Sequence, residues 1–223
     1  MAEPYQNPVK KMIPSKLETG FQQFLYKHAG KYIPKNATPN QVTAVGALGG
    51  LFAVIMTLLT NISPLFFIGT ILGLATHLIA DDLDGYVART RQMSSKAGAY
   101  FDLITDVLFS TFLLLAFGLT PYVHLAPAAF AAPLYGIMNV TMMNYIIYFN
   151  EFQFPRLGPI EAHLGYTACA LIAMTVRDRV LFTLFGLPVF ACDILMVLAM
   201  LPMYYEMIRM AITLFRRLKK EIS

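Results

Sequence analysis

One block of sequence, residues 81–106, indicates both the architecture of this chain and its chemistry. It reads Asp81-Asp82-Leu83-Asp84-Gly85-Tyr86-Val87-Ala88-Arg89, eight further residues, and Gly98-Ala99-Tyr100-Phe101-Asp102-Leu103-Ile104-Thr105-Asp106. The block lies between two long apolar segments and holds five of the 13 acidic residues in the chain. Carboxylates at a membrane boundary are costly unless a bound cation or a proton relay compensates their charge. We therefore interpret the block as a functional site rather than as a solvated surface.

The composition around the block is that of a membrane protein. Of the 223 residues, 57% are hydrophobic and only 13% are charged, a low charge content for a soluble domain. Several apolar runs reach the ~20 residues that cross a bilayer core. We expect an all-α integral membrane protein with six transmembrane helices, at about residues 41–60, 63–80, 98–118, 125–148, 162–177 and 180–205.

The segment before the first span has a helical pattern of its own. Residues 17–29 place apolar side chains on roughly one helical face, which is typical of an amphipathic helix lying in the membrane interface. A short helix packed on the rest of the protein fits the same pattern. We divide the chain into a cytoplasmic N-terminal segment with this interfacial helix, residues 1–35, and a six-helix transmembrane domain, residues 36–223.

The distribution of Lys and Arg predicts the orientation in the membrane. With six spans, the side that carries the block holds 15 of these residues, and the opposite side holds only Arg177 and Arg179. We therefore expect a protein of the cytoplasmic membrane whose site faces the cytoplasm. Because the basic residues flank the spans, the expected partners include membrane lipids and exclude nucleic acid.

The acidic residues of the block are spaced for two helix faces. Asp81 and Asp84 are three residues apart and Asp102 and Asp106 are four apart, so each pair shares a face. Two antiparallel helices would bring the four carboxylates to one point, where they would repel one another. Oxygen-only ligands favour Mg²⁺ or Mn²⁺, and the absence of His and Cys from the block argues against zinc. We expect two such ions, bridged by shared carboxylates, to bind a phosphoryl or pyrophosphate group.

Several other residues have structural interpretations. Asp82 fits a helix N-cap or a solvated turn. His77, one turn before Asp81, is close enough in sequence to contact the site, but we favour a packed and hydrogen-bonded histidine. Asp193 lies inside the last predicted span and therefore needs a polar partner. Small residues and thiols in the spans suit helix packing, namely Gly46, Gly49, Gly50, Cys169 and Cys192.

The pattern D-x-x-D-G-x-x-A-R, eight residues, G-x-x-x-D-x-x-x-D resembles the signature of the CDP-alcohol phosphotransferase (CDP-alcohol phosphatidyltransferase) family. All eight fixed positions match: Asp81, Asp84, Gly85, Ala88, Arg89, Gly98, Asp102 and Asp106. A weaker match is Thr38-Pro39-Asn40-Gln41-Val42-Thr43, just before the first span. Chain length and the predicted spans also fit the family, so the resemblance covers nearly the whole chain.

The resemblance implies a reaction and a set of roles. A CDP-linked donor, CDP-diacylglycerol or a CDP-amino-alcohol, would pass its phosphoryl-alcohol group to the hydroxyl of an alcohol or lipid acceptor and release CMP. Asp81, Asp84 and Asp102 would hold two metal ions, while Asp106 would contact one of them and act as the general base. The cytidine and its diphosphate would lie among Asn40, Thr43, Gly85, Ala88, Arg89 and Ser95. Homodimers are common in the family, so we expect one here.

The branch of the family and the competing functions stay open at this point. Asp102-Leu103-Ile104-Thr105-Asp106-Val107 departs from the D-P-x-A-D-K-like ending of phosphatidylglycerophosphate synthases. Gly158-Pro159-Ile160-Glu161 resembles a G-P-x-E stretch of the choline and ethanolamine branch, but a turn that starts a helix explains it equally well. Phospholipid biosynthesis is the expected process. The alternatives are a cation-coupled membrane transporter that uses the aspartates as an ion site, and a catalytically inactive scaffold.

Overall fold

The computed structural model describes residues 10–12, 16–153, 155–156 and 158–221, which form a mainly helical protein. Its α-helices are α1 (Lys16–His28), α2 (Pro39–Leu59), α3 (Phe67–Thr90), α4 (Lys96–Gly118), α5 (Leu125–Phe149), α6 (Pro159–Val176) and α7 (Ala191–Glu221), with 3₁₀ turns η1 (Gly30–Tyr32) and η2 (Pro64–Phe66). Two small sheets complete the fold. Strand β1 (Lys10–Met12) pairs in parallel with β2 (Glu151–Gln153), and β3 (Phe182–Leu184) pairs antiparallel with β4 (Leu187–Val189).

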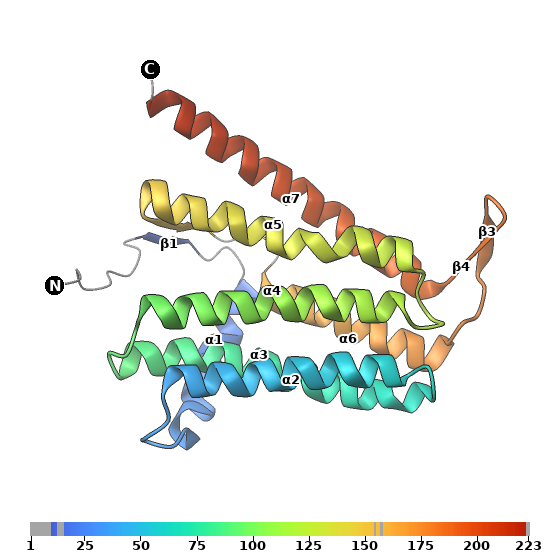
Figure 1. Ribbon diagram of the computed structural model, residues 1–223, viewed down its shortest axis with the longest axis horizontal. Helices are drawn as coiled ribbons and strands as arrows, with labels where there is room; N and C mark the ends of the chain where they lie inside the picture. The colour runs from blue at the N-terminus through green and yellow to red at the C-terminus, as the bar shows by residue number, and fades with distance from the viewer. Residues whose placement is uncertain (1–9, 13–15, 154, 157, 222–223) are drawn as a thin grey trace.

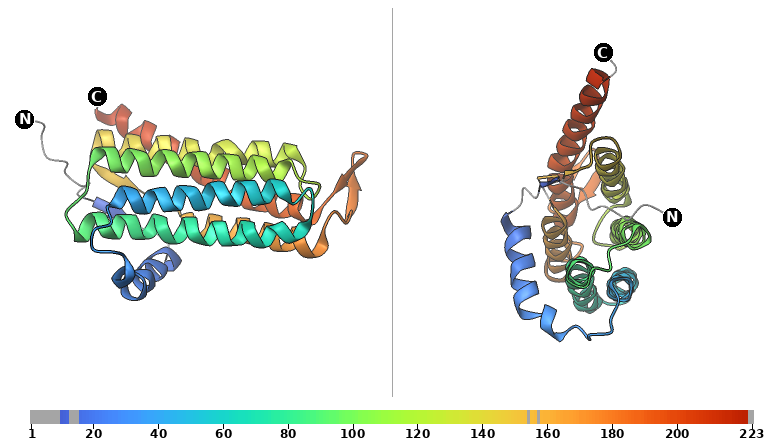
Figure 2. Two further views of the ribbon diagram at one scale, coloured as in Figure 1. Left: turned by 60° about the horizontal axis from the view of Figure 1, so that its bottom comes forward. Right: turned by 90° about the vertical axis from the view of Figure 1, so that its left-hand side faces the viewer.

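The helices form a bundle whose members share one long axis. Helices α2 to α6 lie side by side along this axis, while α7 is inclined to them and its C-terminal half extends away (Figure 1). Helix α1 runs across the axis, near the end where α2 begins and α3 ends (Figure 2). The β3–β4 hairpin projects from the opposite end (Figure 1). The segment joining α3 to α4, which lies in the middle of the motif, is therefore at the same end as α1.

Among the described residues, five helices are long and apolar enough to cross a membrane. They are Pro39–Leu59, Pro64–Thr90, Lys96–Gly118, Leu125–Phe149 and Ala191–Lys220. These helices indicate a membrane protein. Helix α6, with 18 residues, corresponds to the fifth predicted span but is not among them, so the count of six stays a prediction. A helix also covers the predicted interfacial segment, and its position relative to a membrane stays a prediction too. Residues 1–9 and 13–15 of the predicted N-terminal segment lie outside the described residues.

Glycines allow α2 and α3 to approach closely. A Cβ atom added to Gly73 would lie 2.7 Å from the backbone nitrogen of Ala53 and 2.7 Å from the carbonyl oxygen of Gly49. A Cβ on Gly49 would lie 2.8 Å from the side chain of Thr76. This contact between backbones confirms the packing interpretation of the glycines in the first span. It also fixes α3, which carries half of the motif, against α2.

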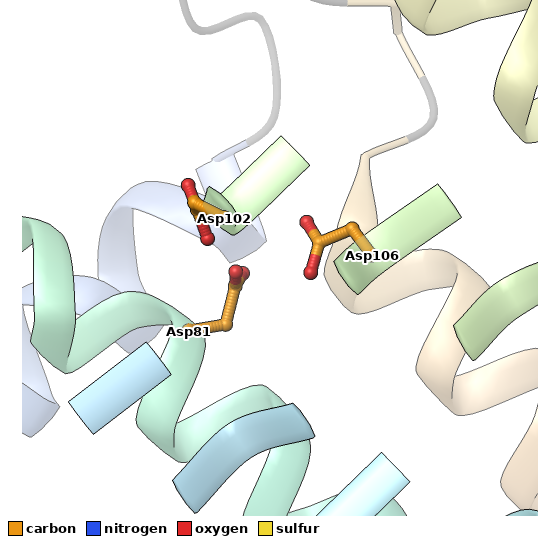
Figure 3. A group of neighbouring side chains, drawn as sticks. All are labelled: Asp81, Asp102 and Asp106. Atoms are coloured by element: carbon orange, nitrogen blue, oxygen red, sulfur yellow. The ribbon is translucent and has the colours of Figure 1, made fainter. Parts of the chain in front are cut away.

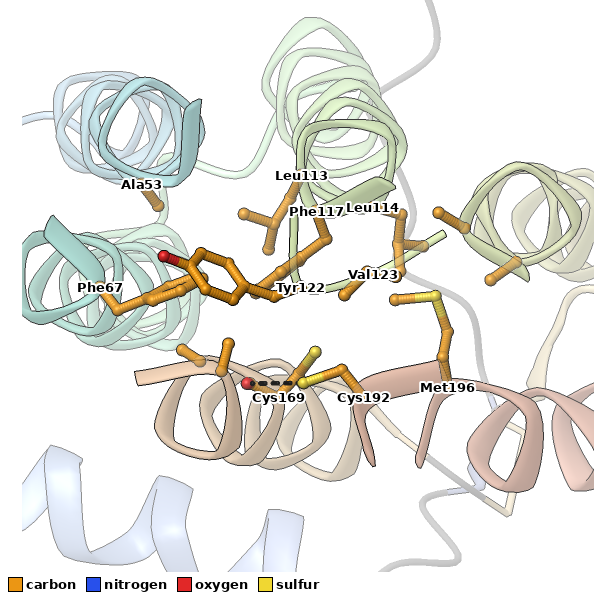
Figure 4. Packing of buried hydrophobic residues seen from close by; sticks show 14 of the residues in the cluster. Ala53, Phe67, Leu113, Leu114, Phe117, Tyr122, Val123, Cys169, Cys192 and Met196 are labelled. Carbon is orange, nitrogen blue, oxygen red and sulfur yellow. Dashed lines mark hydrogen bonds between the residues drawn. The ribbon is translucent and has the colours of Figure 1, made fainter. Parts of the chain in front are cut away.

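The hydrophobic core lies between α2, α3, α4, α5, α6 and the start of α7 (Figure 4). The fully buried rings of Phe67 and Phe117 stack with centroids 5.9 Å apart. Cys169 and Cys192 are free and buried, and the Cys192 thiol donates a hydrogen bond to the Cys169 carbonyl at 3.5 Å. The prediction of packed thiols is therefore confirmed, and the core joins the helices that carry the motif to α6 and α7.

One helix extends beyond its predicted span, and one predicted boundary is wrong. Helix α3 continues past residue 80 to Thr90, so the first half of the motif is helical, as the shared face of Asp81 and Asp84 requires. The sixth predicted span begins too early, because the β3–β4 hairpin occupies Phe182–Val189 and α7 starts only at Ala191. At the hairpin tip Phe185 and Gly186 have φ angles of 52° and 82°, in the left-handed region that a tight two-residue turn requires. A short apolar run alone cannot separate such a hairpin from a helix.

Candidate metal centre

Carboxylates of the motif meet between α3 and α4. Asp81 on α3 and Asp102 and Asp106 on α4 point toward one another (Figure 3), and one ligand oxygen from each lies within 4.8 Å of the others. Asp84 follows Asp81 by one turn of α3 and lines the same small cavity. The four aspartates that the sequence singles out therefore lie around one cavity, as two antiparallel helices with these spacings require.

The start of α2 closes one side of this cavity. The buried Thr43 hydroxyl donates a hydrogen bond to Asp84 Oδ2 at 2.5 Å. Local sequence fixes Thr43 there, because Thr38 and Gln41 form a capping box at the start of α2. The Gln41 amide donates to the Thr38 hydroxyl at 3.3 Å, and the Thr38 amide donates to the Gln41 side chain at 2.9 Å. The T-P-N-Q stretch therefore starts the helix that orients Asp84.

The charges of the cluster are not balanced by basic side chains. No ion pair between described residues joins a Lys or Arg to any of the four aspartates. Within the described chain, Asp102 Oδ1 is buried and has no hydrogen-bond partner. Buried carboxylate oxygens without donors are unfavourable. A divalent cation bound to these oxygens would remove both the repulsion and the missing contact, and the oxygen-only donor set fits Mg²⁺ or Mn²⁺.

Two neighbours lie against opposite oxygens of Asp106. The Tyr135 hydroxyl on α5 donates to Asp106 Oδ2 at 3.3 Å, and His77 Nε2 lies 3.5 Å from Asp106 Oδ1. His77 is buried against Phe109, with ring centroids 3.8 Å apart, and its Nδ1 lies 3.3 Å from Nε2 of His163. His163 Nδ1 in turn donates to the Pro159 carbonyl at 2.8 Å. The prediction of a packed, hydrogen-bonded His77 is confirmed, and the structure also places it beside Asp106.

Residues 36–215 match the family model of the CDP-alcohol phosphatidyltransferases. The chain belongs to this family. It is also 37% identical over 112 residues to a protein of Aquifex aeolicus (strain VF5) named bifunctional IPC transferase and DIPP synthase. That match covers 49% of this chain but only 24% of the Aquifex protein, so the chain matches about a quarter of the length of this curated relative. The resemblance inferred from the motif is confirmed.

We predicted six residues of this CDP-alcohol phosphatidyltransferase family member to surround the nucleotide. They are more dispersed than the four aspartates. Of this set only Thr43 lines the aspartate cavity, whereas Asn40, Gly85, Ala88, Arg89 and Ser95 do not. Asn40 and Ser95 nevertheless meet at Gly98: a Cβ added there would lie 3.0 Å from Asn40 Oδ1 and 3.1 Å from Ser95 Oγ. The Ser95 hydroxyl accepts a hydrogen bond from the Gly98 amide at 3.0 Å and caps α4.

The guanidinium of Arg89 turns back along α3. A Cβ added to Gly85, one turn earlier, would lie 3.0 Å from Arg89 Nη1, so the glycine leaves room for this group. Ala88 is half-buried on the same turn as Arg89. The predicted nucleotide residues thus lie toward the end of the bundle where α2 begins, α3 ends and α4 begins.

The interpretation of Asp82 as an N-cap or a solvated residue is wrong. Asp82 is buried inside α3, and its Oδ1 accepts a hydrogen bond from the side-chain amide of Gln22 on α1 at 2.8 Å. The prediction failed because α1, 60 residues away in sequence, covers this face of the helix. Sequence reasoning also missed Tyr135, since an isolated tyrosine in an apolar span carries no signal of its contact with Asp106.

Two further interpretations gain a structural basis. The Gly158 amide donates to Glu161 Oε2 at 2.8 Å, so Glu161 caps the start of α6, in agreement with the turn interpretation. Asp193 has the polar partner that it was expected to need. Its carboxylate accepts hydrogen bonds from the backbone amides of His124 and Phe190 at 2.8 and 2.9 Å, and lies 2.8 Å from His124 Nδ1.

Proposed function

We propose that this protein is a metal-dependent CDP-alcohol phosphotransferase of phospholipid biosynthesis. It transfers the phosphoryl-alcohol group of a CDP-linked donor, CDP-diacylglycerol or a CDP-amino-alcohol, to the hydroxyl of an alcohol or lipid acceptor, with release of CMP. The observation that carries the proposal is the single cavity lined by Asp81, Asp84, Asp102 and Asp106, which have no Lys or Arg partner among the described side chains. Membership of the CDP-alcohol phosphatidyltransferase family supports the choice of reaction.

The four aspartates are the proposed ligands of two divalent cations, Mg²⁺ or Mn²⁺. Two such ions would bind the diphosphate of the donor and neutralise the charge that develops on departing CMP. Asp102 supports this assignment most directly, because its buried Oδ1 has no hydrogen-bond partner in the described chain. Thr43 supports it as well, because its hydroxyl fixes the carboxylate of Asp84.

Asp106 is the proposed general base. An acceptor hydroxyl is a poor nucleophile, so a base within hydrogen-bond reach is needed to take its proton as the new bond to phosphorus forms. The proton passes to the Asp106 carboxylate while the bond between phosphorus and the CMP oxygen breaks. The Tyr135 hydroxyl donates to one oxygen of this carboxylate, and His77 lies beside the other. The proposed contacts of the cytidine and its diphosphate are Asn40, Thr43, Gly85, Ala88, Arg89 and Ser95.

We further propose that α6 crosses the membrane together with the five apolar helices. Six spans put the motif and most Lys and Arg residues on the cytoplasmic side of the cytoplasmic membrane. Residues 36–223 then form the transmembrane domain, and residues 1–35 a cytoplasmic segment with α1 in the interface. The exposed apolar side chains of Leu17 and Phe24 on α1 support this placement. A homodimer is proposed as the assembly.

The test is release of CMP by the purified protein from CDP-diacylglycerol and from CDP-amino-alcohols, with a panel of acceptors. We expect release that requires Mg²⁺ or Mn²⁺ and is abolished in Asp106→Asn. Asp178→Asn is the matched control, because Asp178 is exposed in the turn after α6, at the far end of the bundle. Cation-coupled uptake into vesicles without nucleotide turnover would support the transporter instead. Failure of the folded protein to bind CDP or metal would support the scaffold.

A further inference from the structure

Helix α1 contacts the motif through a row of side chains. Gln22 Nε2 donates to Asp82 Oδ1 at 2.8 Å, and the ring of Tyr26 stacks on Tyr86 with centroids 4.9 Å apart. Arg89 Nη2 donates to the Tyr26 hydroxyl at 2.7 Å. The contacts on α3 are spaced by four and three residues, and those on α1 by four, as for two helices that face each other. The contact is therefore specific rather than a general apolar packing.

Helix α3 uses two faces in this arrangement. One face carries His77, Asp81 and Asp84 and lines the aspartate cavity. The other carries Asp82 and Arg89 and faces α1. Arg89 belongs to the second face by its contact with Tyr26, yet its guanidinium turns back along the helix toward the turn that carries Asp84. Tyr26 of α1 thus contacts the guanidinium of Arg89, the basic group of α3 that follows the aspartates of the motif.

Two contacts define the position of this guanidinium. Gly85 leaves the space that Nη1 occupies, since a Cβ there would lie 3.0 Å from it, and the Tyr26 hydroxyl accepts a hydrogen bond from Nη2. An exposed arginine otherwise samples many rotamers, and ordering it on binding opposes affinity. Helix α1 lies outside residues 36–215, the part of the chain that matches the family. The matched region therefore does not supply this constraint.

We infer that Tyr26 is a positioning residue, which holds the Arg89 guanidinium over Gly85 in the orientation that binds the diphosphate of the CDP-linked donor. The inference rests on the proposed function, because it takes the donor to be a CDP compound. A contact to the diphosphate that is equally strong in the ground state and in the transition state changes KM and leaves kcat unaltered. The inference therefore predicts a change in donor KM. A general loss of structure would instead lower kcat, and with it the rate at every donor concentration.

The experiment is Tyr26→Phe in the full-length protein, which removes the hydroxyl and keeps the ring on Tyr86. We expect the KM for the CDP-linked donor to rise about tenfold, equivalent to about 1.4 kcal/mol, with kcat and the Mg²⁺ requirement within twofold of wild type. Tyr32→Phe is the matched control, because Tyr32 is 77% exposed and should leave KM unchanged. In an Arg89→Lys background, Tyr26→Phe should add no further effect, since the lost contact is the same.

An unchanged donor KM in Tyr26→Phe overturns the inference, and so does a full additive effect in the Arg89→Lys background. Binding of CDP to the full-length protein in Mg²⁺ separates this outcome from failure of the proposed function. Weaker CDP binding by Tyr26→Phe than by Tyr32→Phe supports the positioning role even if no acceptor yields turnover. Equal binding by the two variants overturns it, whether or not the wild-type protein releases CMP.

Discussion

Substitution of Thr43 by valine isolates one contact of the aspartate cavity. Valine has nearly the shape of threonine, so Thr43→Val removes the hydroxyl that donates to Asp84 Oδ2 and leaves the packing of α2 in place. Thr43 is 6% exposed and Asp84 is 6% exposed, so bulk water cannot replace the lost donor. The carboxylate of Asp84 then loses the group that orients it.

The size of the effect follows from the kind of bond. A hydrogen bond to a charged group contributes about 1.5–3 kcal/mol, and about 1.4 kcal/mol corresponds to a tenfold change in an equilibrium constant. Loss of a partner that orients a metal ligand typically costs about 10- to 100-fold in metal affinity or activity. The two estimates agree. We therefore expect the Mg²⁺ concentration for half-maximal CMP release to rise about 10- to 100-fold in Thr43→Val.

The assay is CMP release as a function of Mg²⁺ concentration at saturating donor. Thr43→Ser keeps the hydroxyl and should restore most of the Mg²⁺ affinity. Thr57→Val is the control on the same helix, because Thr57 is fully buried and its hydroxyl bonds to the Ala53 carbonyl at 2.8 Å, far from the aspartates. It should lower the free energy of unfolding by about 1 kcal/mol and leave Mg²⁺ activation unchanged.

A wild-type Mg²⁺ response in Thr43→Val would refute the reasoning. If the variant instead raised the KM for the CDP-linked donor at saturating Mg²⁺, Thr43 would contact the cytidine directly, as the motif resemblance implies. The two results separate an indirect role, through Asp84, from a direct role in nucleotide binding. Parallel shifts in Thr57→Val would show that the effect comes from altered packing of α2.

Three further changes test other parts of the structure. Gly73→Ala forces a Cβ to within 2.7 Å of two backbone atoms of α2. It should lower the free energy of unfolding in detergent by about 1–3 kcal/mol. Gly165→Ala, with open space around the glycine, should leave that free energy unchanged. Tyr135→Phe removes a donor to Asp106 and should lower kcat about fivefold, for the loss of about 1 kcal/mol, with Mg²⁺ activation shifted by less; an unchanged kcat would exclude a role in orienting the base. Asp193→Ala removes an acceptor of two backbone amides and should lower the free energy of unfolding by about 2 kcal/mol, while CMP release per folded molecule stays at the wild-type rate.

The motif could be placed from the sequence because its information is local. Spacings of three and four residues put Asp81 with Asp84 and Asp102 with Asp106 on common faces, whatever the rest of the chain does. The short connection between α3 and α4 then makes the two helices antiparallel, α2 packs against both of them, and the four carboxylates meet at one cavity. Composition and hydropathy were sufficient to predict a helical membrane protein for the same reason.

Contacts that depend on distant segments could not be predicted. Asp82 looked like a solvated residue because nothing near it in sequence accounts for a buried carboxylate, and its partner Gln22 lies on α1. Tyr135 reaches Asp106 from α5 and His124 reaches Asp193 across 69 residues, so neither pairing leaves a local pattern. The β3–β4 hairpin was missed for another reason: its apolar residues fit a strand and a helix equally well.

The two faces of α3 explain why the motif alone does not predict every contact around the site. Asp81 and Asp84 are fixed positions of the family signature and face the cavity, whereas Asp82 is a free position that is buried all the same. A buried carboxylate at a free position requires a partner from outside the signature, and α1 provides it through Gln22. Arg89 joins the two sets, since it is a fixed position whose guanidinium donates to the Tyr26 hydroxyl. If Arg89 binds the donor diphosphate as we propose, the geometry there is set jointly by the signature and by a helix that precedes the matched region.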